Sequence, residues 1–126
     1  MKTWFVSGHL DLTQAEFDEH YAGAIRDAAW EGDEFVVGDA AGADSMAQQF
    51  IQAVGARATV FHMLDAPRNN AGFPTRGGFK SDRERDEAMT AASDADIAWV
   101  RPGREKSGTA KNMKRRHASA KSGAAD

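Results

Sequence analysis

Cysteine is absent from this 126-residue sequence, which excludes disulfide bonds, thiolate catalysis and zinc sites built on sulfur. Long apolar runs are also missing. None approaches the roughly 18 residues that a membrane-spanning helix needs, and the N-terminal MKTWFVSG is too short for a secretory leader. The four histidines show no metal-pair spacing. We therefore expect a cytoplasmic protein with no membrane partner, no metal and no cofactor.

The chain is long enough for one domain with a packed core. Its 41% hydrophobic and 28% charged residues are the proportions of an ordinary globular protein. The formal net charge of −3 is unevenly distributed, with −9 over residues 1–100 and +6 over residues 101–126. Such an asymmetry is typical of a nucleic-acid-binding tail or of an electropositive anion site. Arg101, Arg104 and Lys106 precede a Ser-Gly-Thr segment, and this position favours the anion site.

Four short apolar runs alternate with amphipathic segments along the chain. Each run is too continuous for a strand with one face in water and therefore predicts a buried, parallel strand. The segments between them repeat apolar residues at helical spacing, and Thr13-Gln-Ala-Glu16 has the form of a capping box at a helix start. The predicted strands cover residues 4–6, 35–37, 58–63 and 97–100, and the predicted helices cover residues 13–31, 46–54, 81–93 and 108–115.

This alternation predicts an α/β fold, a small Rossmann-like three-layer sandwich with a mostly parallel sheet of about four to five strands. We assign residues 1–117 to one Rossmann-like domain. The remaining segment, 118–126, is small and polar and is expected to be a disordered tail.

Residues 64–80 show neither helical nor strand periodicity and are expected to form a long loop. Arg68, Arg76 and Lys80 in that loop are candidates for a lid that closes over an anionic ligand. An ordinary solvated loop or a subunit contact fits the same residues equally well.

Glycine, serine and aspartate follow the predicted strands, at the edge of the sheet where ligands bind in open α/β folds. Gly38 and Gly42 allow a backbone to approach a ligand closely, although a tight turn capped by Asp44 is an equal alternative. Residues 107–109 place two hydroxyls and a glycine at a helix start, which suits a phosphate or another small anion. The candidate ligand-binding residues at this edge are Ser7, Gly8, His9, Gly38, Asp39, Ala40, Gly42, Asp44, Ser107, Gly108 and Thr109.

Titratable side chains at the same edge are candidates for catalysis. His9 is the only histidine whose position suggests chemistry, because His62 lies within a predicted strand and is expected to be buried. Asp39 has no evident capping role. The carboxylates at this edge are Asp11, Asp39, Asp44 and Glu16, and a pair of them could supply the nucleophile and the acid or base that cleave an N-glycosidic bond. The sequence does not identify which carboxylate would act.

Four short motifs occur in the order Gly38-Asp-Ala-x-Gly42-Ala-Asp44 with Ala47, Arg85-Asp86-x-x-Met89, Asp94-x-Asp96 and Ser107-Gly-Thr109. Together they resemble the SLOG superfamily, Rossmann-like proteins that include the YpsA and YspA types, the DNA-processing protein DprA and the lysine-decarboxylase-like LOG proteins. The resemblance extends from Phe5 to about Arg116. It implies a nucleotide-derived ligand across the strand ends, with phosphate at residues 107–109 and with Arg85 among the ligand-binding residues. It also implies a homodimer or higher homo-oligomer.

The hydrolytic LOG proteins carry a P-G-G-x-G-T-x-x-E motif, and this sequence has Asn112 at the position of its glutamate. We therefore expect a domain that binds a nucleotide or nucleotide-derived phosphorylated ligand as a sensor or carrier. The alternative is an enzyme, an N-glycosidase or deoxyribosyltransferase acting on nucleosides or nucleoside monophosphates. A second alternative is single-stranded nucleic-acid binding of the DprA kind through Lys111, Lys114, Arg115 and Arg116, against which the acidic charge of the body argues.

Overall fold

The structure, a computed structural model, describes the backbone of residues 1–125 and the side chains of residues 1–118. Most of the segment 118–126, for which the sequence predicts disorder, lies outside the residues with described side chains. Among the helices of residues 1–125, none has the length and apolarity needed to cross a membrane.

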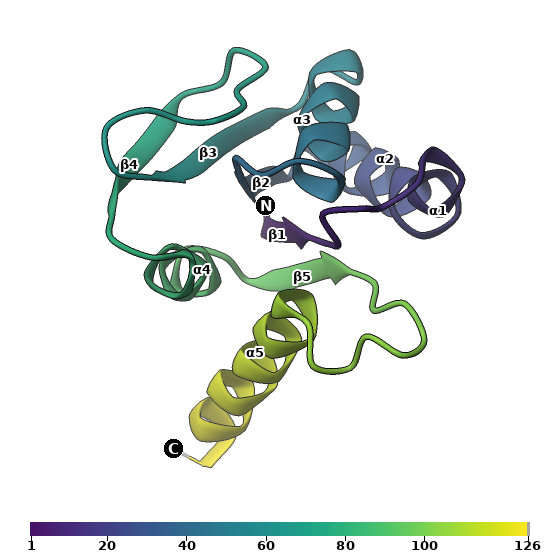
Figure 1. The fold of residues 1–126 in the computed structure, drawn as a ribbon. Coiled ribbons are helices and arrows are strands. Elements are labelled where there is room, and N and C mark those ends of the chain that lie inside the picture. The colour runs from purple at the N-terminus through teal and green to yellow at the C-terminus, as the bar shows by residue number, and fades with distance from the viewer. Residues whose placement is uncertain (126) are drawn as a thin grey trace.

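Five parallel strands form one sheet, and they are β1 (Thr3–Ser7), β2 (Glu34–Gly38), β3 (Arg57–Met63), β4 (Thr75–Phe79) and β5 (Ala95–Ala98). Their order across the sheet is β4-β3-β2-β1-β5 (Figure 1). The central strands β1 and β2 pair from Thr3 opposite Glu34 to Val6 opposite Val37. Both are short apolar runs, as expected for strands buried on two faces. The predicted α/β fold with a parallel sheet is confirmed.

The helices are α1 (Gln14–Phe17), the π-helical turn η1 (Asp18–Ala22), α2 (Gly23–Trp30), α3 (Ala43–Ala53), α4 (Asp82–Ala91) and α5 (Gly108–Ala125). The first three run on from one another and match the predicted helix over residues 13–31. Its predicted capping box is present, because the Thr13 hydroxyl accepts the Glu16 N–H at 3.1 Å and the Glu16 carboxylate accepts the Thr13 N–H at 3.0 Å. Helix α5 continues beyond its predicted end near Arg115.

Strand β4 lies inside residues 64–80, where the sequence predicts a loop, so that prediction is wrong for this part of the segment. The strand extends the sheet beside β3, with Thr75 opposite Val60, and most of its side chains are exposed. Because most side chains of this edge strand are exposed, its sequence lacks the alternation of apolar and polar residues that identifies a half-buried strand. Gly77 also has a packing role, because a Cβ there would lie 2.1 Å from Cε1 of His62. A glycine that looks like a loop signal is therefore needed where the strand packs against its neighbour.

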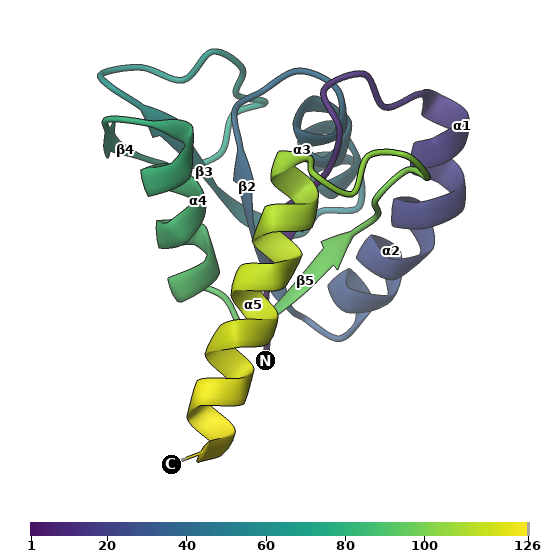
Figure 2. The same ribbon diagram turned by 60° about the horizontal axis from the view of Figure 1, so that its bottom comes forward.

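The helices cover the two faces of the sheet unequally (Figures 1 and 2). Helices α1 to α3 cover one face over the larger core cluster, to which Phe17, Tyr21 and Ile51 contribute. Helices α4 and α5 lie side by side on the other face, over a small cluster of Phe5, Val36, Phe61 and Met89. Because so few apolar side chains fill this second face, space remains between the starts of α4 and α5.

Candidate functional site

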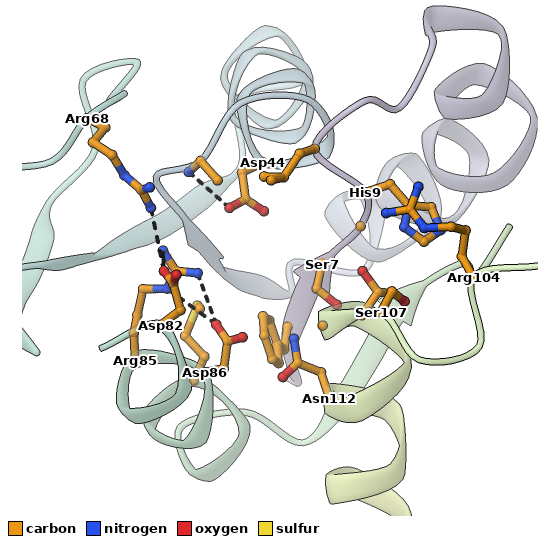
Figure 3. A pocket seen from close by; sticks show the side chains of 17 residues that line it. Ser7, His9, Asp44, Arg68, Asp82, Arg85, Asp86, Arg104, Ser107 and Asn112 are labelled. Atoms are coloured by element: carbon orange, nitrogen blue, oxygen red, sulfur yellow. Dashed lines mark hydrogen bonds and ion pairs between the residues drawn. The ribbon is translucent and has the colours of Figure 1, made fainter. Parts of the chain in front are cut away.

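A cavity of about 270 Å³ lies beyond the carboxyl ends of the central strands, between the start of α3, the side of α4 and the first turn of α5 (Figure 3). This is the edge at which the sequence predicts a ligand site. The predicted residues in its wall are Ser7, Gly8, His9, Ala40, Asp44, Arg68, Arg85, Ser107, Gly108 and Thr109. Within the described residues, the predicted positions outside its wall are Gly38, Asp39, Gly42, Arg76 and Lys80.

The wall also contains residues that sequence reasoning did not assign to the site. Asp82, Asp86 and Met89 share one face of α4 at spacings of three and four residues, and that periodicity is the signal that could have found them. Asn112 follows Gly108 by one turn on α5 and shares its face in the same way. The additional lining residues are Phe5, Leu10, Asp82, Asp86, Met89 and Asn112.

The glycines after β2 serve the packing of the chain against itself. A Cβ on Gly42 would lie 2.2 Å from the carbonyl oxygen of Leu10, and a Cβ on Gly38 would lie 2.4 Å from Oδ2 of Asp44. Both distances are far below van der Waals contact. Gly42 therefore lets the segments after β1 and β2 come together, and Gly38 leaves room for the Asp44 carboxylate. Both shape the cavity without lining it.

Ser7 presents a buried hydroxyl to the cavity (Figure 3). The residue is 7% exposed, and within the described part of the chain its Oγ has no hydrogen-bond partner. The Ser7 carbonyl accepts a bond from the Tyr21 hydroxyl at 2.7 Å, and that hydroxyl accepts the Trp99 N–H at 3.0 Å. Tyr21 thus ties the ends of β1 and β5 together. A buried hydroxyl without a partner costs roughly 1–3 kcal/mol, so a ligand that supplies an acceptor here is favoured.

The first turn of α5 directs backbone amides toward the same cavity. Ser107 caps the helix, because its Oγ accepts the Ala110 N–H at 3.2 Å. The N–H groups of Gly108 and Thr109 have no acceptor within the helix, and the helix dipole places partial positive charge around them. Arg104 lines the cavity beside this turn and brings a positive charge, which Asp11, 3.7 Å from its guanidinium, compensates in part. These groups together suit an anion.

The other two cations predicted to attract an anion lie elsewhere. Arg101 binds the carboxylate of Glu16 at 2.7 Å and that of Asp11 at 3.1 Å. The hydrogen bond from Arg101 lowers the pKa of Glu16 to about 2. Lys106 is exposed and does not line this cavity. Arg101 therefore fastens the loop after β5 to the start of α1, and Arg104 is the cation that reaches the site.

His9 is held as a neutral ring. It is 3% exposed, and its Nε2 accepts the Arg101 N–H at 2.8 Å, so the ring proton lies on Nδ1. Burial, followed by the positive charges of Arg104 and Arg101, lowers the pKa of His9. Its one basic nitrogen is already engaged by the backbone, which disfavours His9 as a general base.

Asp39 is engaged by two arginines. Its carboxylate accepts the Arg68 backbone N–H at 2.8 Å and two guanidinium bonds from Arg68 at 3.2 and 3.0 Å. Arg85 donates to the same carboxylate at 2.9 Å. Burial raises the pKa of Asp39, but the bonds and charge from Arg68, with the charge of Arg85, outweigh it and hold the pKa below its ordinary value. A carboxylate bound in this way positions the arginines and is a poor nucleophile.

The three cations of the predicted lid separate in the structure. Arg68 lines the cavity while bound to Asp39, and the segment around it is fixed further by Gln48, whose side chain bonds the backbone of Asn69 and Ala71. Arg76 lies over the rings of Phe61 and Phe79 on the sheet edge, at 5.2 and 5.8 Å from their centroids. The Lys80 N–H donates to Glu84 at the start of α4. Closure of this loop over a ligand stays a prediction.

Two further carboxyl groups, Asp44 and Asp86, face the cavity from α3 and α4 (Figure 3). Burial raises the pKa of Asp44 to about 6. The hydrogen bond that its carboxylate accepts from the Ala40 N–H at 3.1 Å lowers the pKa but does not offset the burial. Burial also raises the pKa of Asp86, although Arg85 lies 3.2 Å away and opposes the shift. Among the described side chains, no group of three or more histidines or carboxylates is arranged to hold a metal ion.

The raised pKa of Asp44 predicts a specific pH dependence. Between about pH 4 and pH 6 the folded protein keeps a proton that the unfolded chain has released, so stability falls as the pH rises through this window. Replacement of Asp44 by asparagine removes the effect. We expect Asp44→Asn to gain about 3 kcal/mol over the wild type at pH 8 and to lose that advantage near pH 4. Denaturant unfolding at several pH values measures this difference.

The exposed loop residue Asp65 provides a matched control. Asp65→Asn removes one exposed carboxyl group outside the wall of the cavity and should follow the wild-type curve. Parallel stability curves for Asp44→Asn and the wild type from pH 4 to pH 8 would contradict the assignment of this titration to Asp44.

A five-stranded parallel sheet with helices on both faces and a cavity at its carboxyl edge defines a small Rossmann-like α/β protein. The chain is similar to the X-ray structure of TM1055, a structural genomics target, at 15% sequence identity and a TM-score of 0.74, over 94% of this chain and 69% of that one. No protein-family model matches the chain, and no curated protein matches it. At this level of identity the likeness shows the fold alone.

Proposed function

We propose that the protein binds a nucleotide or nucleotide-derived phosphorylated ligand in the cavity, as a sensor or carrier. The unpartnered hydroxyl of Ser7 carries this proposal, since it is a buried donor beside the amides of Gly108 and Thr109 and the guanidinium of Arg104. A phosphate gives all four groups an acceptor at once. The motifs that resemble the SLOG superfamily supply many of the cavity residues, so we extend the proposal to membership of that superfamily and to a homodimer or higher homo-oligomer.

Ser7→Ala separates a binding role from a structural one. Removing an unsatisfied buried hydroxyl should leave the stability of the unliganded protein unchanged or slightly raised. The same change should weaken binding of a phosphorylated ligand by about tenfold, because a hydrogen bond to a charged group is lost. We would measure unfolding temperatures with AMP, CMP, deoxynucleoside monophosphates, cyclic nucleotides and ADP-ribose, since a ligand at 100 times its Kd adds about 2.7 kcal/mol.

Arg104→Gln tests the charge at the same site and should also reduce the ligand-induced shift. Arg57→Gln is its control, because Arg57 is an exposed arginine at the start of β3, remote from the carboxyl edge and paired with Glu34. An equal loss of binding in both variants, or full binding by Ser7→Ala and Arg104→Gln, would place the ligand elsewhere.

A second candidate function is cleavage or transfer at the N-glycosidic bond of nucleosides or nucleoside monophosphates. The observation that favours it is a pair of carboxyl groups that line the cavity, Asp44, whose pKa of about 6 suits proton transfer near neutral pH, and Asp86, whose pKa burial also raises. Asn112 opposes it, because this amide lines the cavity where the hydrolytic LOG motif has its glutamate. Chromatography for free base, after incubation with the nucleoside and nucleotide panel, tests the activity, and no release from any compound would exclude it for that panel.

The nucleic-acid alternative depends on the cations of α5, two of which make contacts inside the protein. Arg116 donates to Asp96 at 3.1 Å and to the carbonyl oxygen of Ser93 at 2.8 Å. Arg115 donates to Asn112 at 2.6 Å. Arg116 is therefore committed to a carboxylate of the protein itself, whereas Arg115 keeps its charge beside the neutral Asn112 at the cavity wall. We favour the small phosphorylated ligand.

A further inference from the structure

A second cavity, of about 500 Å³, lies between α4 and α5 and adjoins the first. The two cavities share Asp82, Asp86, Gly108 and Asn112 in their walls. The second is lined in addition by Arg83, Lys111 and Arg115. The shared wall makes one continuous site that runs from Ser7 past the first turn of α5.

The size of the first cavity indicates that a ligand continues into the second. Sites for small molecules occupy about 300–1,000 Å³, whereas the first cavity holds about 270 Å³. The first cavity therefore lies just below the lower end of this range. For a ligand whose phosphate lies at Gly108 and that needs more room, the adjoining space along α5 is open.

The charges of the second cavity favour an anion. Its lining carries three cations, Arg83, Lys111 and Arg115, against two carboxylates, Asp82 and Asp86. Arg85, which Asp39 also binds, lies 3.4 Å from Asp82 and 3.2 Å from Asp86 and offsets part of their charge. Arg115 is held at the boundary of the two cavities by its 2.6 Å bond to the neutral Asn112, and Lys111 is an exposed cation on the same wall. Lys111 and Arg115 therefore present positive charge to whatever enters.

The spacing along α5 sets the distance between two anionic groups of one ligand. Lys111 follows Gly108 by three residues, which is about 4.5 Å along the helix axis. A second phosphoryl group joined to the first through a bridging oxygen stays within reach of the long Lys111 side chain.

We propose that the groove between α4 and α5 is a second anion subsite for the same ligand, so that the protein prefers a nucleotide-derived diphosphate to the corresponding monophosphate. This inference rests on the proposed function, because the first phosphate must lie at the start of α5. Lys111 and Arg115 then determine specificity, and Ser7 and Arg104 provide the affinity common to both ligands.

Titration calorimetry with AMP and ADP, and with the guanosine and cytidine pairs, tests the preference in the absence of divalent cations. We expect the wild-type protein to bind one diphosphate at least about tenfold more tightly than its monophosphate, the effect of one additional charged contact. Lys111→Gln should abolish that ratio and change the monophosphate affinity less than about twofold. Lys114→Gln, which removes a lysine of the same helix outside both cavities, should keep the ratio.

The outcomes distinguish this inference from the proposed function. Monophosphate binding with equal affinity for the diphosphate, or a ratio that survives both Lys111→Gln and Arg115→Gln, overturns the second subsite and leaves the first intact. If no phosphorylated compound binds the wild-type protein, the proposed function fails and the second subsite fails with it.

Discussion

Replacement of Gly42 by alanine is expected to lower the free energy of unfolding by about 4 kcal/mol. Gly42 has φ 72° and ψ −123°, a conformation that L-residues avoid, and adopting it costs a side-chain-bearing residue of order 1–3 kcal/mol. The new Cβ would also lie 2.2 Å from the carbonyl oxygen of Leu10 and 2.5 Å from that of His9. Both contacts are to backbone, so no side-chain rotation relieves them, and overpacking of this kind adds about 1–3 kcal/mol.

Gly55→Ala is the matched control for this variant. Gly55 has a similar φ of 74°, but a Cβ there meets no atom within 4 Å. Its cost is therefore that of the backbone conformation alone, about 1 kcal/mol. Urea unfolding of both variants, with the m-value checked, measures the difference. Equal losses at the two positions would show that the segments after β1 and β2 do not pack as closely as described.

Asp39→Ala is the second variant with a large expected effect, a loss of about 3 kcal/mol. Removing this carboxylate leaves Arg85, which is 6% exposed, with Asp82 and Asp86 as its only partners among those described here. Removing one partner of a buried ion pair costs roughly 3–5 kcal/mol. We expect the lower end of this range because Arg85 keeps two carboxylate partners. Arg68 is half-exposed and adds little to the total.

The same variant should release the segment around Arg68, which Asp39 fixes through three hydrogen bonds. Amide hydrogen exchange should therefore speed up in residues 65–71 before the sheet is affected. Glu87→Ala is the control, because it breaks an arginine–carboxylate pair of 2.8 Å with Arg83 on the exposed side of α4, worth less than about 1 kcal/mol. A comparable stability loss in the two variants would mean that Asp39 is not the anchor of this network.

The features predicted correctly from sequence depend on neighbours in the chain. The capping box joins Thr13 to Glu16, and the cap of α4 joins Ser81 to Glu84, so both are visible in a window of four residues. The central strands β1 and β2 could be recognised for a similar reason, because each holds an uninterrupted apolar run. Strand β5 (Ala95–Ala98) begins two residues before the predicted strand 97–100, because Asp96 interrupts its apolar pattern.

The features that escaped prediction depend on distant partners. The role of Asp39 is decided by Arg68 and Arg85, which lie 29 and 46 residues away in sequence. Without those partners, Asp39 appeared to be free for chemistry. The unpartnered hydroxyl of Ser7 likewise follows from the burial that the whole fold imposes, and no local pattern reports it.

The central claim is that Ser7, the first turn of α5 and Arg104 bind the phosphate of a nucleotide-derived ligand. Titration calorimetry of the wild-type protein and Ser7→Ala with a phosphorylated ligand and its dephosphorylated nucleoside tests the claim most directly. We predict that the phosphate adds at least about 100-fold to wild-type affinity, and that Ser7→Ala removes about tenfold of this gain without weakening nucleoside binding. Equal wild-type affinities for nucleotide and nucleoside, or the same phosphate gain in both proteins, would contradict the claim.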